Sequence, residues 1–158
     1  MSYINNFKTT DDLVSHFQNH VPCLTDEFLK AKYTGFLVVN AITTYEIAIK
    51  EIFIDFAKEQ NEILCTFVSN YFYRINGKIK IDKLKEYIGL FGEKYLNEFK
   101  NELTQIQNQN IISNYSNLIV CRNKYVHEGD LTLTFQEVVD NYNIGKKIIE
   151  ILYDIMQK

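Results

Sequence analysis

The stretch that decides the fold reads DEFLKAKYTGFLVVNAITTYEIAIKEIFIDFAKEQ, from Asp26 to Gln60. Apolar residues recur along it at helical spacing, and Gly35 is its single helix breaker. The segment Thr25-Asp26-Glu27 is a helix start, and Pro22, shortly before it, ends the preceding helix. We therefore expect one long helix here, which serves as the central strut of the fold.

The segments on either side are also predicted to be helical, because the chain has one proline, six glycines and apolar residues at intervals of three and four. Asn76-Gly77 is the clearest turn, and Gly129 is a natural helix C-terminus. The further helices are expected at about residues 10–20, 61–73, 81–90, 93–107, 110–128 and 134–156. The fold class is thus all-α: a compact bundle of four core helices plus short extra helices, in a single domain over residues 1–158.

Composition restricts the kind of protein this can be. The formal net charge is −3, so RNA binding would need a local patch or a few well-placed cations. The three cysteines are widely spaced and are expected to be reduced thiols in or near the core. There is no signal-peptide pattern, no membrane span, and no phosphate-binding loop, nucleophile elbow or dinucleotide fingerprint, so a cytoplasmic protein is expected.

The segment RNKYVH, from Arg122 to His127, combines residue types that suit phosphate chemistry. Arg122 is in register with the apolar stripe of its helix, and an arginine on a buried face needs an anion. His127 lies about 140° around an ideal helix from Arg122, whereas Asn123 shares its face at i, i+4 and can hold the imidazole. Arg122 and His127 can meet at one phosphate if the arginine reaches around, if the helix distorts near Gly129, or if a second copy faces the first. This geometry predicts a dimer. The stripe itself consists of Ile111, Tyr115, Leu118, Arg122 and Val126.

This pattern, Arg-Asn, three residues, then His, in the penultimate helix of a small bundle, resembles the motif of the HEPN superfamily. The similarity extends to the long helix from Phe28 to Ala57, to the segment from Ile81 to Leu90 and to the final helix. From about Asp26 to its C-terminus the chain is similar to the RiboL-PSP-HEPN, or MAE-like, branch. It departs from some toxin members, which have a tyrosine at the position of Gly129.

The resemblance implies a homodimer of helical bundles whose motif helices line a shared cleft, with Arg122, Asn123 and His127 as catalytic residues. It implies a metal-independent endoribonuclease of a toxin–antitoxin or phage-defence system, with no cofactor. Histidine titrates near neutrality and can transfer protons, while arginine donates two hydrogen bonds to phosphate oxygens. The expected partners are RNA, a second copy of the chain, and an antitoxin or neighbouring defence protein.

Two other functions stay open from the same residues: a non-catalytic RNA- or nucleotide-binding module, and a structural dimer or interaction protein. Arg122 can instead pair with a buried carboxylate such as Glu46, and His127 can be a cation that favours the helix C-terminus. Glu46 and Tyr125 are also candidates for supporting the site, with Glu46 orienting Arg122.

Lys78, Lys80 and Lys124 are candidate RNA contacts. Residues 71–80 mix aromatic rings with cations, which can bind single-stranded RNA, although a turn with buried rings and solvated lysines has the same pattern. His16 and His20 have a spacing that can bind zinc, but no further ligand is evident nearby, so we expect an exposed helix face there and no metal site.

Overall fold

The computed structural model describes residues 2–158, the side chains of residues 2 and 106 excepted, and over this range the chain is all-α, without a strand. Its helices are α1 (Ser2–His20), α2 (Glu27–Gln60), α3 (Glu62–Tyr73), α4 (Ile81–Gly89), α5 (Glu93–Thr104), α6 (Gln109–Glu128) and α7 (Phe135–Met156). The predicted all-α class is therefore confirmed. Within the described range, no helix combines the length and apolar character that crossing a membrane requires.

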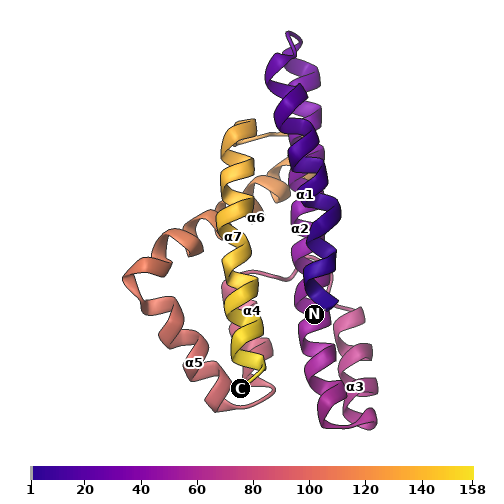
Figure 1. Ribbon diagram of the computed structural model, residues 1–158, viewed down its shortest axis with the longest axis vertical. Helices are drawn as coiled ribbons and strands as arrows, with labels where there is room; N and C mark the ends of the chain where they lie inside the picture. The colour runs from indigo at the N-terminus through magenta and orange to yellow at the C-terminus, as the bar shows by residue number, and fades with distance from the viewer. Residues whose placement is uncertain (1) are drawn as a thin grey trace.

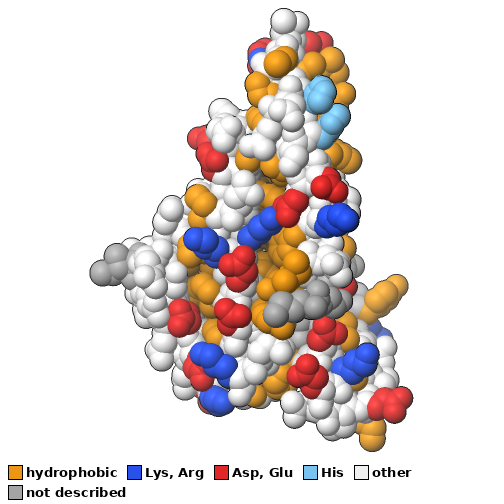
Figure 2. Space-filling view, in the orientation of Figure 1, with side chains coloured by type: hydrophobic (Ala, Val, Ile, Leu, Met, Phe, Trp, Pro, Cys, Tyr) orange, Lys and Arg blue, Asp and Glu red, His pale blue; other side chains and the backbone are white. Residues whose placement is uncertain are grey.

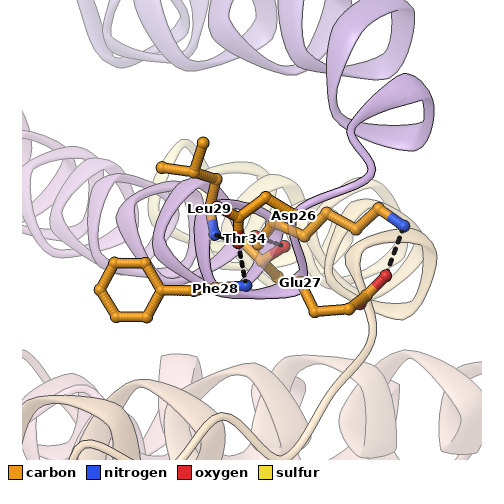
Figure 3. Close-up of polar contacts among 6 residues, drawn as sticks. Asp26, Glu27, Phe28, Leu29 and Thr34 are labelled. Carbon is orange, nitrogen blue, oxygen red and sulfur yellow. Dashed lines mark hydrogen bonds and ion pairs between the residues drawn. The ribbon is translucent and has the colours of Figure 1, made fainter.

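α2 is the central strut that the sequence predicts, with α1 antiparallel along one side and α3 folded back along its C-terminal part (Figure 1). The helix starts where its cap residue places it. The carboxylate of Asp26 accepts hydrogen bonds from the N–H of Phe28 at 2.9 Å and of Leu29 at 3.2 Å (Figure 3). In the same turn, Lys30 pairs with Glu27 at 2.8 Å.

The core is centred on three stacked tyrosines, one each from α2, α6 and α7. The ring of Tyr45 lies between those of Tyr115, at 5.5 Å, and Tyr142, at 5.8 Å. The Tyr45 hydroxyl also donates to the carbonyl of Tyr142 at 2.5 Å. α7 can approach this closely because of Gly145, where a Cβ would lie 2.8 Å from the Tyr45 hydroxyl. The stack thus fixes the register of α2, α6 and α7 relative to one another.

The connection between α3 and α4, residues 74–80, is tied to the bundle at both α2 and α6. The N–H of Gly77, a residue with φ of 69°, donates to Glu46 on α2 at 2.7 Å. The hydroxyl of Tyr115 on α6 donates to the carbonyl of Ile79 at 2.5 Å. This non-helical segment therefore has a fixed position across two core helices.

The helix ends agree with the sequence-based expectation to within a few residues, except at the start of α1. That helix was expected from Thr10 and begins at Ser2. It extends further because Tyr3 and Phe7 are buried against the bundle, so tertiary packing outweighs the cap signal. Thr10 itself is buried, and its hydroxyl shares a hydrogen bond of 2.7 Å with that of Thr44.

Two smaller expectations concern the burial of the cysteines and the exposure of the histidines of α1. Cys121 is buried and Cys65 is partly buried, but Cys23 is exposed at the end of the short 3₁₀ helix Val21–Cys23, which joins α1 to α2. The expectation of a core or near-core thiol is wrong for Cys23. His16 and His20 are exposed, as predicted, and their rings stack at 4.2 Å. Figure 2 shows histidine side chains on the surface of the projecting end of α1, on a face where acidic and basic groups are interspersed.

Candidate functional site

The RNKYVH segment forms the last turns of α6, where the helix passes from the core to the surface. Leu118 is buried, Arg122 is half-buried and Val126 is 48% exposed, so the prediction of a stripe buried through Val126 is wrong. The cause is the register with α7. Tyr115 lies opposite Gly145 in this antiparallel pair, which places Val126 at the level where α7 begins. Beyond that level there is no neighbouring helix turn of α7 to cover the stripe.

The guanidinium of Arg122 turns toward the next residue on its own helix. Its Nη1 donates to Oδ1 of Asn123 at 3.2 Å. Among the described residues, no carboxylate lies within ion-pair distance of this half-buried cation. Because arginine has five N–H donors, most of them stay available to a ligand such as a phosphate.

Glu46, a sequence-based candidate partner of Arg122, is engaged elsewhere. Its carboxylate binds Lys50 at 2.7 Å and the N–H of Gly77 at 2.7 Å. The contacts of Tyr45 with Tyr115 and of Gly35 with Tyr125 set an antiparallel register, which places Glu46 about 12 Å along the helix axis from Arg122. The predicted pairing is not found, and Glu46 anchors the 74–80 connection instead.

His127 is exposed in the final turn of α6. The helix ends at Gly129, as predicted, because this residue has a left-handed φ of 74°. Val120, Asn123 and His127 share one side of α6 at the i, i+3, i+7 spacing. No hydrogen bond between Asn123 and the imidazole is found among the described residues, and the Asn123 carbonyl accepts from Arg122. Asn123 instead draws the guanidinium toward the side of the helix that carries His127.

Tyr125 locks this end of α6 onto α2. Its ring lies over Gly35 so closely that a Cβ on that glycine would be 2.1 Å from Cζ of the tyrosine. Any side chain at position 35 must therefore displace the ring. The sequence shows Gly35 only as a helix interruption, and no spacing rule links it to Tyr125. The contact was missed by sequence reasoning, yet it fixes the level of the motif along α2.

A comparison with known proteins agrees with this helical arrangement. The chain matches the RiboL-PSP-HEPN family over residues 4–158, nearly its whole length. The chain belongs to this family. No curated protein and no solved structure matches it significantly. The predicted family is confirmed, and the match begins well before Asp26, so α1 is part of the family domain rather than an addition to it.

In this RiboL-PSP-HEPN domain the motif lies outside five surface hollows of the described residues. These hollows are lined from other parts of the chain, and Arg122, Asn123 and His127 line none of them. Instead, Val120 and Val126 leave about half of their apolar surface in solvent beside the motif. In a single chain the motif is thus an open surface.

The lysines considered for RNA binding lie in two places. Lys124 is exposed on α6, within the motif segment itself. Lys78 and Lys80 are exposed on the 74–80 connection, which is bonded to α6 through Tyr115. Tyr115 precedes Arg122 by about 10 Å along the helix axis. Lys124 therefore lies on α6 of the RiboL-PSP-HEPN domain, and Lys78 and Lys80 lie on a segment that is bonded to α6.

Proposed function

We propose that this RiboL-PSP-HEPN domain is a metal-independent endoribonuclease whose site is shared across a homodimer, in a toxin–antitoxin or phage-defence system. The observation that carries the proposal is the state of Arg122. Its guanidinium is half-buried, has no carboxylate partner among the described residues, and is held by Asn123 on the helix that presents His127 to solvent. A cation placed in this way suits a phosphodiester as its counter-ion.

RNA supplies its own nucleophile for this chemistry. The ribose 2′-oxygen attacks phosphorus while the bond from phosphorus to the 5′-oxygen breaks. One histidine takes the proton of the 2′-hydroxyl, and a second gives a proton to the leaving 5′-oxygen. Arg122 stabilises the charge that develops on the non-bridging oxygens of the pentacoordinate phosphorane. The products are a 2′,3′-cyclic phosphate and a free 5′-hydroxyl, and DNA is inert because it lacks the 2′-hydroxyl.

The need for two proton-transfer groups favours a site made by two chains. Each chain offers one histidine in this segment, and it lies about 140° around α6 from Arg122. Val120 and Val126 flank the motif with apolar surface that a second chain can cover. A two-fold axis beside α6 brings both copies of His127 to one cleft, as an isologous interface requires.

The chemistry is tested by incubating the purified protein with single-stranded RNA in EDTA and identifying the new ends. We expect 2′,3′-cyclic phosphates, and a rate lower by about 10²–10⁴-fold in His127→Ala. Arg122→Ala should lose about 10²–10³-fold, because a donor to the phosphorane is removed. His16→Ala removes an exposed histidine from α1 and is the matched control, expected to cleave like the parent. Equal rates for His127→Ala and the parent would refute the proposal.

The shared site is tested with mixed dimers of parent and His127→Ala chains. If each cleft needs both histidines, an equal mixture that has exchanged subunits keeps about one quarter of the parent activity, because only dimers of two parent chains are intact. If each chain carried a complete site, about one half would remain. The second result would contradict the shared cleft without affecting the assignment of His127.

The biological setting has its own test in growing cells. Expression of the parent should arrest growth, and expression of His127→Ala should not. Cleaved cellular RNA ending in 2′,3′-cyclic phosphates should accompany the arrest. Normal growth at high levels of active enzyme would argue against a toxin or defence effector and leave the ribonuclease activity to be assigned to another process.

A non-catalytic RNA-binding module is the second candidate, and the position of Asn123 favours it. The Asn123 carbonyl accepts from Arg122, and among the described residues no hydrogen bond orients the imidazole of His127 within one chain. This function predicts RNA that is bound but uncut in EDTA, with weaker binding in Arg122→Ala and unchanged binding in His127→Ala.

A further inference from the structure

A second surface gathers cations that the motif does not use. Residues 70–86 contain five basic and two acidic side chains, in a chain whose 17 basic residues are outnumbered by 20 acidic ones. Of these, Arg74, Lys78 and Lys80 are exposed and have no ion-pair partner among the described residues. Positive charge is thus concentrated around the segment that joins α3 to α4.

Two of these cations, Arg74 and Lys78, line an open hollow of 540 Å³ between α3 and α4. The α3 wall presents the rings of Phe67, which is 69% exposed, and Tyr71, which is 41% exposed, with the amide of Asn70 between them. The basic side chains that line the hollow are those of Arg74, Lys78 and Lys83. Exposed rings next to cations are the combination that single-stranded RNA requires, because bases stack on the rings while phosphates bind the cations.

α4 adds a further group that attracts anions. The helix begins at Ile81 with Lys80 as its N-cap, and no side chain caps its N–H groups. Free N–H groups at a helix N-terminus bind phosphate, and Lys80 adds its charge at the same place. Glu86, the carboxylate among the lining residues, is paired with Lys83 at 2.6 Å. It therefore does not face the hollow as an uncompensated negative charge.

The adjacent hollow shows what the cations contribute. It measures 660 Å³, shares Phe67 and Tyr71, and is lined by further apolar residues of α2, α3 and α5, but none of its described lining residues is basic. Its chemistry gives no preference for a phosphate-bearing partner. Of these two neighbours, the hollow between α3 and α4 is the one that combines the shared rings with positive charge, so it is this one that fits a nucleic acid strand.

We propose that the hollow between α3 and α4 binds single-stranded RNA, with bases stacked on Phe67 and Tyr71 and phosphates held by Lys78 in the hollow and by Lys80 at the N-terminus of α4. The inference rests on the proposed function in one respect, that the bound strand is the substrate of the RNKYVH segment. The 74–80 connection is bonded to α6 through the hydroxyl of Tyr115, about 10 Å along the helix axis from Arg122. A strand that leaves the hollow along this connection approaches the motif.

The test is the binding of a 12-nucleotide single strand with 2′-O-methyl riboses, which lacks the nucleophile and so reports binding without cleavage. Fluorescence anisotropy is measured over a range of salt concentrations. We expect Lys78→Gln with Lys80→Gln to weaken binding and to flatten the salt dependence by a slope of about 1.4, or about 0.7 for each phosphate that is no longer neutralised. Phe67→Leu should weaken binding about tenfold with an unchanged slope, because a stacking surface is removed while every charge is kept.

Two controls decide the result. Lys147→Gln removes an exposed lysine of α7 and should leave affinity and slope unchanged. Circular dichroism of each variant checks the fold, which these exposed positions should not disturb.

An unchanged slope in the double lysine variant would overturn the inference, even if the parent cleaves RNA. Equal affinity for a poly-glutamate chain would overturn it too, in favour of an acidic protein partner. Lysine-dependent RNA binding without cleavage would support the surface while the proposed activity fails.

Discussion

The contact between Gly35 and Tyr125 gives the sharpest prediction, because it joins α2 to the motif through a single missing side chain. Gly35→Ala adds one methyl group 2.1 Å from Cζ of the Tyr125 ring, whereas ordinary contacts begin at 3.4 Å. The ring must therefore retreat by more than about 1 Å. Since Tyr125 lies between Arg122 and His127 on α6, that retreat displaces both.

The expected cost separates stability from activity. Overpacking of this kind costs about 1–3 kcal/mol, while alanine in a helix interior regains about 1 kcal/mol relative to glycine. The net loss of unfolding free energy is thus about 0–2 kcal/mol. A shift of about 1 Å in reacting groups can lower a rate by about 10²-fold. We therefore expect RNA cleavage to fall far more than stability does.

A double-mutant cycle isolates the contact. Urea unfolding is measured for the parent, Gly35→Ala, Tyr125→Ala and the double variant. The three atoms nearest to the added methyl all belong to the Tyr125 ring, so Gly35→Ala in the Tyr125→Ala background should be neutral or stabilising by about 1 kcal/mol. Gly89→Ala is the matched control, since a Cβ there lies 3.6 Å from its nearest neighbour. Equal costs of Gly35→Ala in both backgrounds would refute the close contact.

Three further outcomes are expected. Burial raises the pKa of Tyr87 to about 12 and also raises the pKa of Tyr115. Because these tyrosines ionise at lower pH in the unfolded chain than in the folded one, the free energy of unfolding is highest below pH 10 and falls as the pH rises toward 12. Urea unfolding at a series of pH values measures this decrease. Tyr115→Phe removes the bond to Ile79 and should cost about 1 kcal/mol while speeding hydrogen exchange in residues 74–80; unchanged exchange there would contradict the anchoring. Thr134→Ala breaks the capping box with Glu137 and should lower the unfolding free energy by about 1 kcal/mol, whereas Thr134→Asn should retain most of it.

The features that sequence reasoning predicted are those that local chemistry determines. Asp26 caps α2 and Gly129 ends α6 because a carboxylate at the N-cap and a left-handed glycine satisfy helix ends without help from the rest of the chain. The long apolar periodicity from residue 27 to 60 likewise suffices for one helix. The family resemblance followed from the order of these helices and the spacing of the motif within the penultimate one.

The features that it could not predict depend on distant parts of the chain. The start of α1 at Ser2 follows from the burial of Tyr3 and Phe7 rather than from a cap. The exposure of Val126 follows from the level at which α7 begins, which periodicity within α6 does not contain. The engagement of Glu46 with the 74–80 connection is a tertiary contact of the same kind.

The tyrosine stack of the core also determines the intrinsic fluorescence of this protein. The chain contains eleven tyrosines and no tryptophan, and three of the phenol rings lie against one another at the junction of α2, α6 and α7. Its intrinsic emission therefore comes from phenols alone, and separation of the stacked rings on unfolding changes it. A tryptophan introduced at the exposed Val126 would be the sole indole of the protein, and its emission maximum would shift when a ligand or a second chain binds beside His127.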